Sequence, residues 1–337
     1  MITLRLVRPS DINAIVSLSN RRLWQRHTGY DQWYTDPVKK SNQTPWERLT
    51  LYQRYLNAGV WCDPILYKNH LNWLTKSGGF SLAAEETEGV MKRIIAYCEI
   101  WCAEEPSPMG KTGSIIIMEA DTHFVEDPIP RLYAQAKKEI RARGYSTLAI
   151  CPFSSRAVTA NLDDRRWELL AHNRLYRIPK AKLTASAIPH KIEEVPRSDQ
   201  TIHELFCIDQ SQPPSYLWAS MWEEFEVVPE MKGALRRQPV RRVHLEYGGQ
   251  SLTAMLWLWT LSDPEDYWRL SVWVPPGKED DRDLLFELTR IAAEIWPGSD
   301  IPGFTISADE ENGAFLINRG FTTDETKPAE PRYYTAL

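Results

Sequence analysis

The sequence predicts an α/β or α+β protein built from two similar domains. Its 337 residues exceed the usual size of one domain, so each half is long enough to form its own hydrophobic core. Strand-like segments alternate with amphipathic helices and include a strand, helix, strand crossover. The same order of elements recurs at an offset of roughly 155 residues, which favours two copies of one fold.

The first half begins with an alternating strand at 3–9. Ser10 and Asp11 then supply an N-cap for a helix over 12–25. Two helical segments, three strands, a helix that ends in glycine and a final strand follow, at 44–59, 63–79, 80–86, 93–105, 113–125, 130–144 and 147–153.

The second half begins after a connector that contains proline and charged residues, 180–200. Two capped helices, two strands, a helix and a strand are expected at 197–210, 214–226, 250–260, 266–275, 281–296 and 303–308. The repeat therefore divides the chain near residue 190, into domains 1–188 and 189–337.

Composition restricts the class of protein. Charged residues make up 25% of the chain, and no apolar run approaches the length of a membrane span. The N-terminal segment lacks the apolar block of a secretory signal, so we expect a cytoplasmic protein without membrane contact. A net charge of −5 does not suggest a nucleic-acid partner.

The cysteines and the common motifs indicate neither disulfides nor a metal. The five cysteines are spread along the chain without a C-x-x-C pair, which fits reduced thiols: Cys62, Cys98, Cys102, Cys151 and Cys207. No serine-nucleophile elbow, P-loop, dinucleotide fingerprint or zinc spacing is present.

In its order of elements the chain resembles the GNAT superfamily of N-acetyltransferases, specifically the bacterial proteins with two such domains in tandem. Segment 4–20 is similar to the family's first strand and helix, and 306–321 to the closing segment of a second domain. The residues that match that closing segment are Asn312, Ile317, Asn318, Gly320 and Phe321. The resemblance implies two mixed, mostly antiparallel sheets flanked by helices, paired as a pseudo-dimer in a monomer or homodimer, with acetyl-CoA as the acyl donor.

The family's pyrophosphate loop, Q/R-x-x-G-x-G/A, is absent from both corresponding segments, 123–135 and 275–285. The first has two acids and two prolines and no glycine. The second carries Glu279, Asp280, Asp281 and Asp283 at a helix N-terminus, where a phosphate site needs backbone N–H groups and positive potential. Acids there can be explained by helix stability alone, and the alternative is that a cationic ligand or a basic partner docks on them. We therefore assign no cofactor-binding residue, and the sequence argues against acetyl-CoA binding through these loops.

The strand at 113–125 carries the candidate catalytic residues. Its alternation places Ile117, Glu119, Asp121 and His123 on one face. The other face then holds Ile116, Met118, Ala120, Thr122 and Phe124. In the family this strand often supplies the base that takes a proton from the attacking amine, and the resemblance assigns that role to Glu119 or Asp121.

Three alternatives accompany this assignment. Glu99 on the adjacent strand is a further candidate base, and a face exposed to solvent beside a cleft would explain the acids without catalysis. Glu119, Asp121 and His123 could converge on a metal, but nothing elsewhere completes a ligand set, so we expect none.

The family's usual general acid is a tyrosine on the last helix. In the second half, Leu316 stands at its spacing; in the first half, Tyr176 is the candidate, with an ordinary packing role as the alternative. The strand 266–275 contains no carboxylate in its interior, so we predict no base in the second half.

Two functions follow from the sequence. The first is transfer of an acetyl or other acyl group from a CoA thioester to the amine of an unknown acceptor. The second is a catalytically inactive GNAT-fold protein that binds a small molecule or a protein partner, which the altered loops favour. Aminoacyl transfer from tRNA, known among tandem relatives, would need a basic channel that this acidic chain does not indicate.

Overall fold

A computed structural model of the chain describes residues 1–26, 33–36, 41–105, 108–121, 126–150, 167–195, 236–260, 267–275, 277–278, 281–325 and 330–337. The predicted helices 197–210 and 214–226 lie outside these residues, as do His123, Cys151 and Cys207.

In the first half, the predicted strands and helices form, but the helix predicted at 44–59 begins only at Leu51. The strands are β1 (Ile2–Leu6), β4 (Phe80–Glu88), β5 (Met91–Glu105), β6 (Gly110–Ala120) and β7 (Thr147–Ile150). The helices are α1 (Ile12–Arg26), α2 (Leu51–Ala58), α3 (Pro64–Lys76) and α4 (Ile129–Ala142). A small hairpin of β2 (Trp33–Asp36) and β3 (Ser41–Thr44) precedes α2. Short 3₁₀ turns cover Pro9–Asp11, Trp46–Arg48 and Gly59–Cys62.

Capping by neighbouring side chains sets the start of α2 and of α3. Thr50 accepts a hydrogen bond from the N–H of Gln53, and Gln53 accepts one from the N–H of Thr50, which is a capping box. Asp63 accepts hydrogen bonds from the N–H groups of Ile65 and Leu66. These two helix starts therefore follow from local sequence.

The second half repeats this order of elements. Its strands are β9 (His190–Glu194), β10 (Arg236–Arg237), β11 (Arg241–Tyr247), β12 (Gln250–Thr260), β13 (Trp268–Trp273), β14 (Gly303–Ala308) and β15 (Thr322–Thr323). Its helices are α8 (Arg282–Ile295) and α9 (Glu310–Asn318), and a 3₁₀ turn covers Lys180–Lys182. The reading of 180–200 as a connector is wrong in part, because β9 lies within it and pairs with β11.

Strand pairing confirms the predicted repeat. In the first half, β1, β4, β5 and β6 pair antiparallel in that order, and β6 pairs parallel with β7 across the α4 crossover. In the second half, β9, β11, β12 and β13 pair antiparallel, and β13 pairs parallel with β14 across α8. The fold prediction is therefore confirmed: two mixed, mostly antiparallel GNAT-like sheets with flanking helices.

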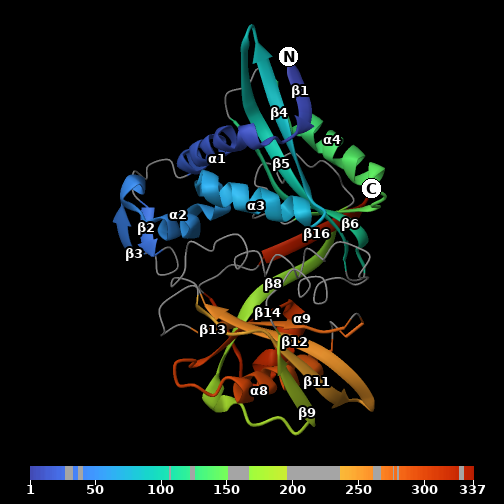
Figure 1. Ribbon diagram of the computed structural model, residues 1–337. Coiled ribbons are helices and arrows are strands. Elements are labelled where there is room, and N and C mark those ends of the chain that lie inside the picture. Colours follow the sequence, from blue (N-terminus) through green and yellow to red (C-terminus); the bar gives the residue numbers. More distant parts are fainter. Residues whose placement is uncertain are drawn as a thin grey trace.

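Two further strands join the halves (Figure 1). β8 (Glu168–Pro179) belongs by sequence to the first half but pairs with β14, whereas β16 (Glu330–Ala336), at the other end of the chain, pairs with β7. β8 and β16 also pair with each other, which joins all described strands except β2 and β3 in one continuous sheet. The boundary at 188/189 stays a prediction, and the strand pairing crosses it in both directions.

In the first half, helices cover both faces of the sheet. α4 places Ile129, Leu132, Ala136 and Ile140 against one face, at the spacing of an amphipathic helix. α1 and α3 cover the opposite face and pack on Tyr97 and Ile117. The acids predicted on β5 and β6 therefore lie under helices.

Candidate functional site

Glu99 and Glu119 lie on the face of β5 and β6 that packs against α1 and α3. Tyr97 is opposite Glu119 and Glu99 is opposite Ile117, so the two acids are diagonal neighbours on adjacent strands. Glu99 is 0% exposed and Glu119 is 4% exposed. The alternative of a solvent-exposed strand face is therefore wrong, because the helices cover it.

A β-bulge changes the alternation predicted for β6. Glu99 pairs with Ile117 but Ile100 pairs with Ile115, so Ile116 is an extra residue in β6. Ile116 packs on the face of the sheet that α3 covers. Ile115, and not Ile116 as predicted, packs on the same face as Met118. The prediction for Ile116 is wrong for this reason, since a pattern of strict alternation contains no bulge.

Glu99 is held by two side chains that the sequence did not single out. Oε2 of Glu99 lies 2.7 Å from Nε2 of His70, and Nε1 of Trp61 donates to Oε1 of Glu99 at 3.1 Å. His70 is 0% exposed and stands on the buried stripe of α3, between Leu66 and Trp73. The sequence signal for this contact was a histidine within the apolar stripe of a predicted helix, and that signal did not identify Glu99 as its partner. Both carboxylate oxygens of Glu99 are therefore engaged.

Buried tyrosines surround these acids. The hydroxyl of Tyr97 is 3.5 Å from Oε2 of Glu119. Burial and then the negative charges of Glu119 and Glu99 raise the pKa of Tyr97 well above its ordinary value. Burial and then the charge of Glu99 do the same to the pKa of Tyr67. Both phenols therefore stay protonated in this cluster at neutral pH.

Asp121 has different surroundings from the other two acids. It follows the last residue of β6, and its side chain is 8% exposed. Nη2 of Arg21, on α1, donates to its Oδ2 at 3.0 Å, and Nη1 of Arg21 donates to Ser17 at 3.0 Å. Asp121 lines a cavity of about 580 Å³ between α1 and strands β1, β4 and β5. It thereby combines a carboxylate with space for a small molecule.

The cavity contains a fixed ion-pair network. Arg5 on β1 donates to both oxygens of Asp11, at 2.6 and 3.0 Å, and to Glu85 at 2.6 Å. Burial works against ionisation of Asp11, but the hydrogen bonds from Arg5 and from the N–H of Arg8 outweigh it and lower the pKa of Asp11. Glu85 also has a lowered pKa, chiefly because of its hydrogen bonds from Arg5.

Tyr176 is not close to the three acids in the fold. It lies on β8, is 3% exposed, and belongs to the core of the second half together with Leu316. Burial raises its pKa. The structure therefore brings Glu99, Glu119 and Asp121 to one face of one sheet and places Tyr176 in another core.

The N-terminus of α4 is occupied by its own side chains. Oδ1 of Asp127 accepts the N–H of Ile129 at 3.0 Å, and the prolines at 128 and 130 have no N–H. The N–H of Ile129 is therefore already engaged at this end of α4.

The acids of α8 have structural partners in the same way. Oδ1 of Asp281 accepts from the N–H of Leu284 at 3.0 Å and from the hydroxyl of Tyr247 at 2.8 Å. Asp283 pairs with Arg319 at 3.1 Å. Burial and then the bond to Asp281 raise the pKa of Tyr247 to about 12. Glu279 and Asp280 lie outside the described residues. The two described acids thus act within the helix cap and its contacts.

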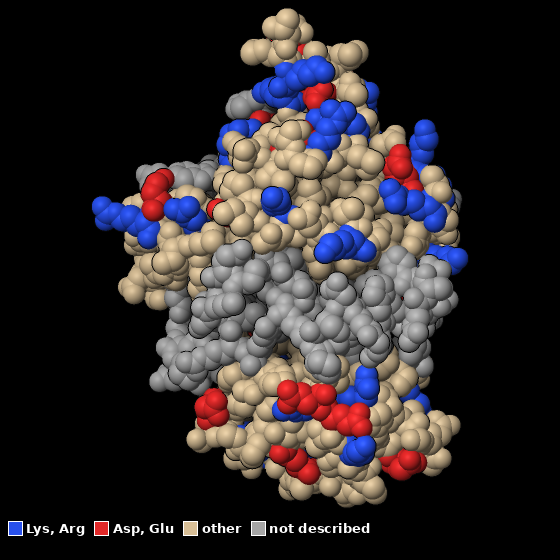
Figure 2. Space-filling view, in the orientation of Figure 1, with Lys and Arg blue, Asp and Glu red and all other residues tan. Residues whose placement is uncertain are grey.

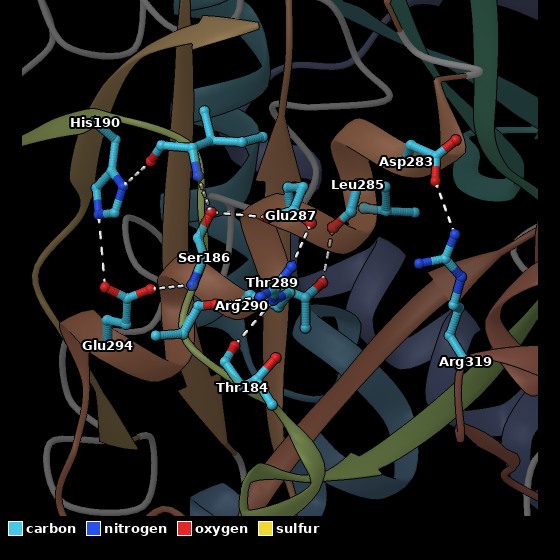
Figure 3. A network of polar contacts seen from close by, with 12 residues as sticks. Thr184, Ser186, His190, Asp283, Leu285, Glu287, Thr289, Arg290, Glu294 and Arg319 are labelled. Atoms are coloured by element: carbon cyan, nitrogen blue, oxygen red, sulfur yellow. Dashed lines mark hydrogen bonds and ion pairs between the residues drawn. The ribbon is translucent and has the colours of Figure 1, made fainter.

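Polar contacts also fasten the segment before β9 to α8 (Figure 3). Ser186 donates from Oγ to Glu287 at 2.8 Å and from its N–H to Glu294 at 2.6 Å. Arg290 donates to the carbonyl oxygens of Thr184 and Ala185. These hydrogen bonds therefore attach residues 184–186 to α8.

Within the described residues, no group of three or more His, Cys, Asp or Glu side chains could hold a metal ion. No described helix is long and apolar enough to cross a membrane. Cys62, Cys98 and Cys102 are free and buried, as predicted for reduced thiols, and burial raises the pKa of Cys62 and of Cys102 to about 12.

Comparison with solved structures identifies the fold. The chain is similar to a GCN5-related N-acetyltransferase from Anabaena variabilis ATCC 29413, with a TM-score of 0.57 and 9% identity over 99% of this chain and 72% of that one. It is similar to a GCN5-related N-acetyltransferase from Kribbella flavida, with a TM-score of 0.56 and 8% identity over 99% and 71%. A probable N-acyltransferase from Enterococcus faecalis V583 gives 0.55 and 8% over 99% and 72%.

No protein-family model and no curated protein matches the sequence. The structural similarity extends over nearly the whole chain, and strand pairing repeats the same unit in each half. The chain therefore has the fold of the GNAT superfamily, with two such units in tandem.

Proposed function

We propose that this protein is an N-acyltransferase of the GNAT type, which transfers an acyl group from a CoA thioester to an amine and uses Asp121 as the base. The observation that supports this role is the position of Asp121 in the wall of a cavity of about 580 Å³, a size usual for small-molecule sites.

Glu99 and Glu119 are weaker candidates on geometry. A base must come within hydrogen-bond reach of the proton that it removes. Glu99 is fully buried and binds His70 and Trp61 through its two oxygens. Glu119 lies between the strands and α1, beside the hydroxyl of Tyr97, and is not part of the cavity wall. We assign both residues to the support of the sheet face.

The residues of this chain would act on the acceptor amine. Asp121 orients the amine by accepting a hydrogen bond from it and takes its proton as the new amide bond forms. The bulge in β6 lies five residues before Asp121, and the backbone N–H of Asp121 donates to the carbonyl oxygen of Ile95 at 2.7 Å, which fixes its position. The CoA thioester supplies an activated acyl group whose thiolate leaves.

The second candidate function is binding without catalysis. It is favoured by Asp127 and Asp281, which occupy the helix ends that the family uses for pyrophosphate. Under this alternative the cavity holds a small molecule and no acyl transfer follows.

The test measures acetyl-CoA binding by titration calorimetry and release of free CoA in the presence of a panel of primary amines. We expect Asp121→Asn to lower the rate of CoA release by about 10²- to 10⁴-fold without weakening acetyl-CoA binding. Glu119→Gln, two residues away, is the matched control and should change the rate much less. If acetyl-CoA does not bind at about 1 mM, its binding free energy is weaker than about −4 kcal/mol. That result would reject the enzyme function and leave binding without catalysis as the remaining candidate.

A further inference from the structure

The cavity beside Asp121 has a mixed lining of opposite charges. Its basic side chains are Arg5, Arg21, Lys92 and Arg93, and its acidic ones are Asp11, Glu85 and Asp121. Figure 2 shows Lys and Arg side chains gathered at the end of the molecule where β1, β4 and β5 lie, with acidic side chains among them. A ligand in this cavity therefore meets both signs of charge.

Arg5 is committed to the protein itself. Its side chain is 15% exposed and binds Asp11 and Glu85 through several short hydrogen bonds. Removing it would take the nearest cation from two partly buried carboxylates, of which Glu85 keeps Lys92 at 3.5 Å, at a high cost. Arg5 and its partners thus form the fixed wall of the cavity.

Arg21 and Asp121 form the pair that can open. The Arg21 side chain is 51% exposed, whereas that of Asp121 is 8% exposed. Arg21 has one hydrogen bond to Asp121 and one to Ser17, which together use two of the five N–H groups of the guanidinium. The guanidinium can therefore swing toward solvent or toward a ligand, while the carboxylate stays in place.

Opening this pair has consequences that depend on the ligand. An amine alone could bind Asp121, but it would separate Arg21 from its carboxylate, whereas Lys92 and Arg93 keep theirs, Glu85 and Glu86. An anion alone could bind Arg21, but it would draw Arg21 away from the largely buried carboxylate of Asp121. A molecule with both charges replaces each half of the pair with an equivalent partner.

We propose that the cavity binds a free amino acid, whose ammonium group takes the place of Arg21 at Asp121 and whose carboxylate is bound by the displaced Arg21. The planar guanidinium suits a carboxylate because two parallel N–H donors match its two oxygens. The volume of about 580 Å³ accommodates such a molecule. This inference rests on the proposed function for the identity of the acceptor: the bound ammonium group first loses one proton to solvent, and Asp121 takes the second as the amine is acylated and the CoA thiolate leaves.

The experiment titrates the full chain with the proteinogenic amino acids and with the amines obtained from them by decarboxylation, for example L-lysine with cadaverine and L-histidine with histamine. We expect at least one amino acid to bind about tenfold or more tightly than its amine. In Arg21→Gln this preference should be lost. Arg141→Gln, an exposed arginine on α4 away from the cavity, should leave it unchanged.

Acyl transfer from acetyl-CoA is measured on the same pairs. Amino-acid binding that depends on Arg21, without any CoA release, supports the ligand class and rejects the proposed enzyme function. CoA release with amines and amino acids alike, unaffected by Arg21→Gln, supports the enzyme and overturns the ligand class. Failure of every amino acid to bind at concentrations up to about 10 mM also overturns it.

Discussion

Replacing His70 by alanine tests the buried contact between α3 and β5. Glu99 is 0% exposed, and its Oε2 lies 2.7 Å from Nε2 of His70. The substitution removes that partner from a carboxylate inside the protein, which keeps the indole N–H of Trp61, at 3.1 Å. Removing the partner of a buried charge costs about 3–5 kcal/mol. We expect a loss of unfolding free energy in this range.

The assay is urea unfolding at neutral pH, followed by circular dichroism. His70→Gln keeps an N–H donor near Glu99 and should cost less than half as much. The double variant His70→Leu with Glu99→Leu removes both polar groups and should recover most of the stability, since an apolar pair of similar size can replace a buried ion pair. A loss below about 1 kcal/mol for His70→Ala would refute the reasoning, because it would mean that Glu99 does not depend on this partner.

Three further predictions concern separate parts of the molecule. The pKa of Asp11 is lowered in the folded state, so its bond with Arg5 stabilises the protein at pH values above the ordinary aspartate pKa of 3.8. This stabilisation is lost as the pH falls through the lowered pKa. In thermal melts, Asp11→Asn should therefore be less stable than the natural protein at pH 7, and the difference should vanish in acid. Asp281→Ala should lower the unfolding free energy by about 0.5–2 kcal/mol through loss of the α8 cap, and Asp281→Asn by clearly less; equal effects in urea unfolding would contradict a capping role. Gly113→Ala would place a Cβ 2.7 Å from the side chain of Ile140 and should cost about 1–3 kcal/mol in the same assay; in an Ile140→Ala background, which lacks all three atoms that the Cβ meets, it should cost less.

The predicted acids illustrate what strand periodicity can and cannot provide. Alternation correctly grouped Glu119 with Ile117, because successive side chains of a strand point to opposite faces. It could not reveal the bulge at Ile116, which arises from pairing with β5. It also could not show that α1 and α3 cover the face, which turned an expected exposed strand into a buried one.

The stabilising role of the acids at the start of α8 was predictable because it depends on local contacts. A carboxylate in the first turn of a helix bonds to N–H groups only a few residues away, so the cap at Asp281 follows from local sequence. Its second contact, with the hydroxyl of Tyr247, joins residues far apart in the chain and needed the folded structure.

The sequence alone determined the type and order of most elements and the two-fold repeat. These depend on residue periodicity and on contacts within a few positions, which are present in any local stretch of chain. Only the tertiary structure decided that β8 and β16 cross between the halves, that His70 pairs with Glu99, and that Arg21 meets Asp121 at a cavity. Each of these contacts joins segments distant in sequence, whose approach is set by packing of the whole sheet against its helices and leaves no periodic signal in either segment.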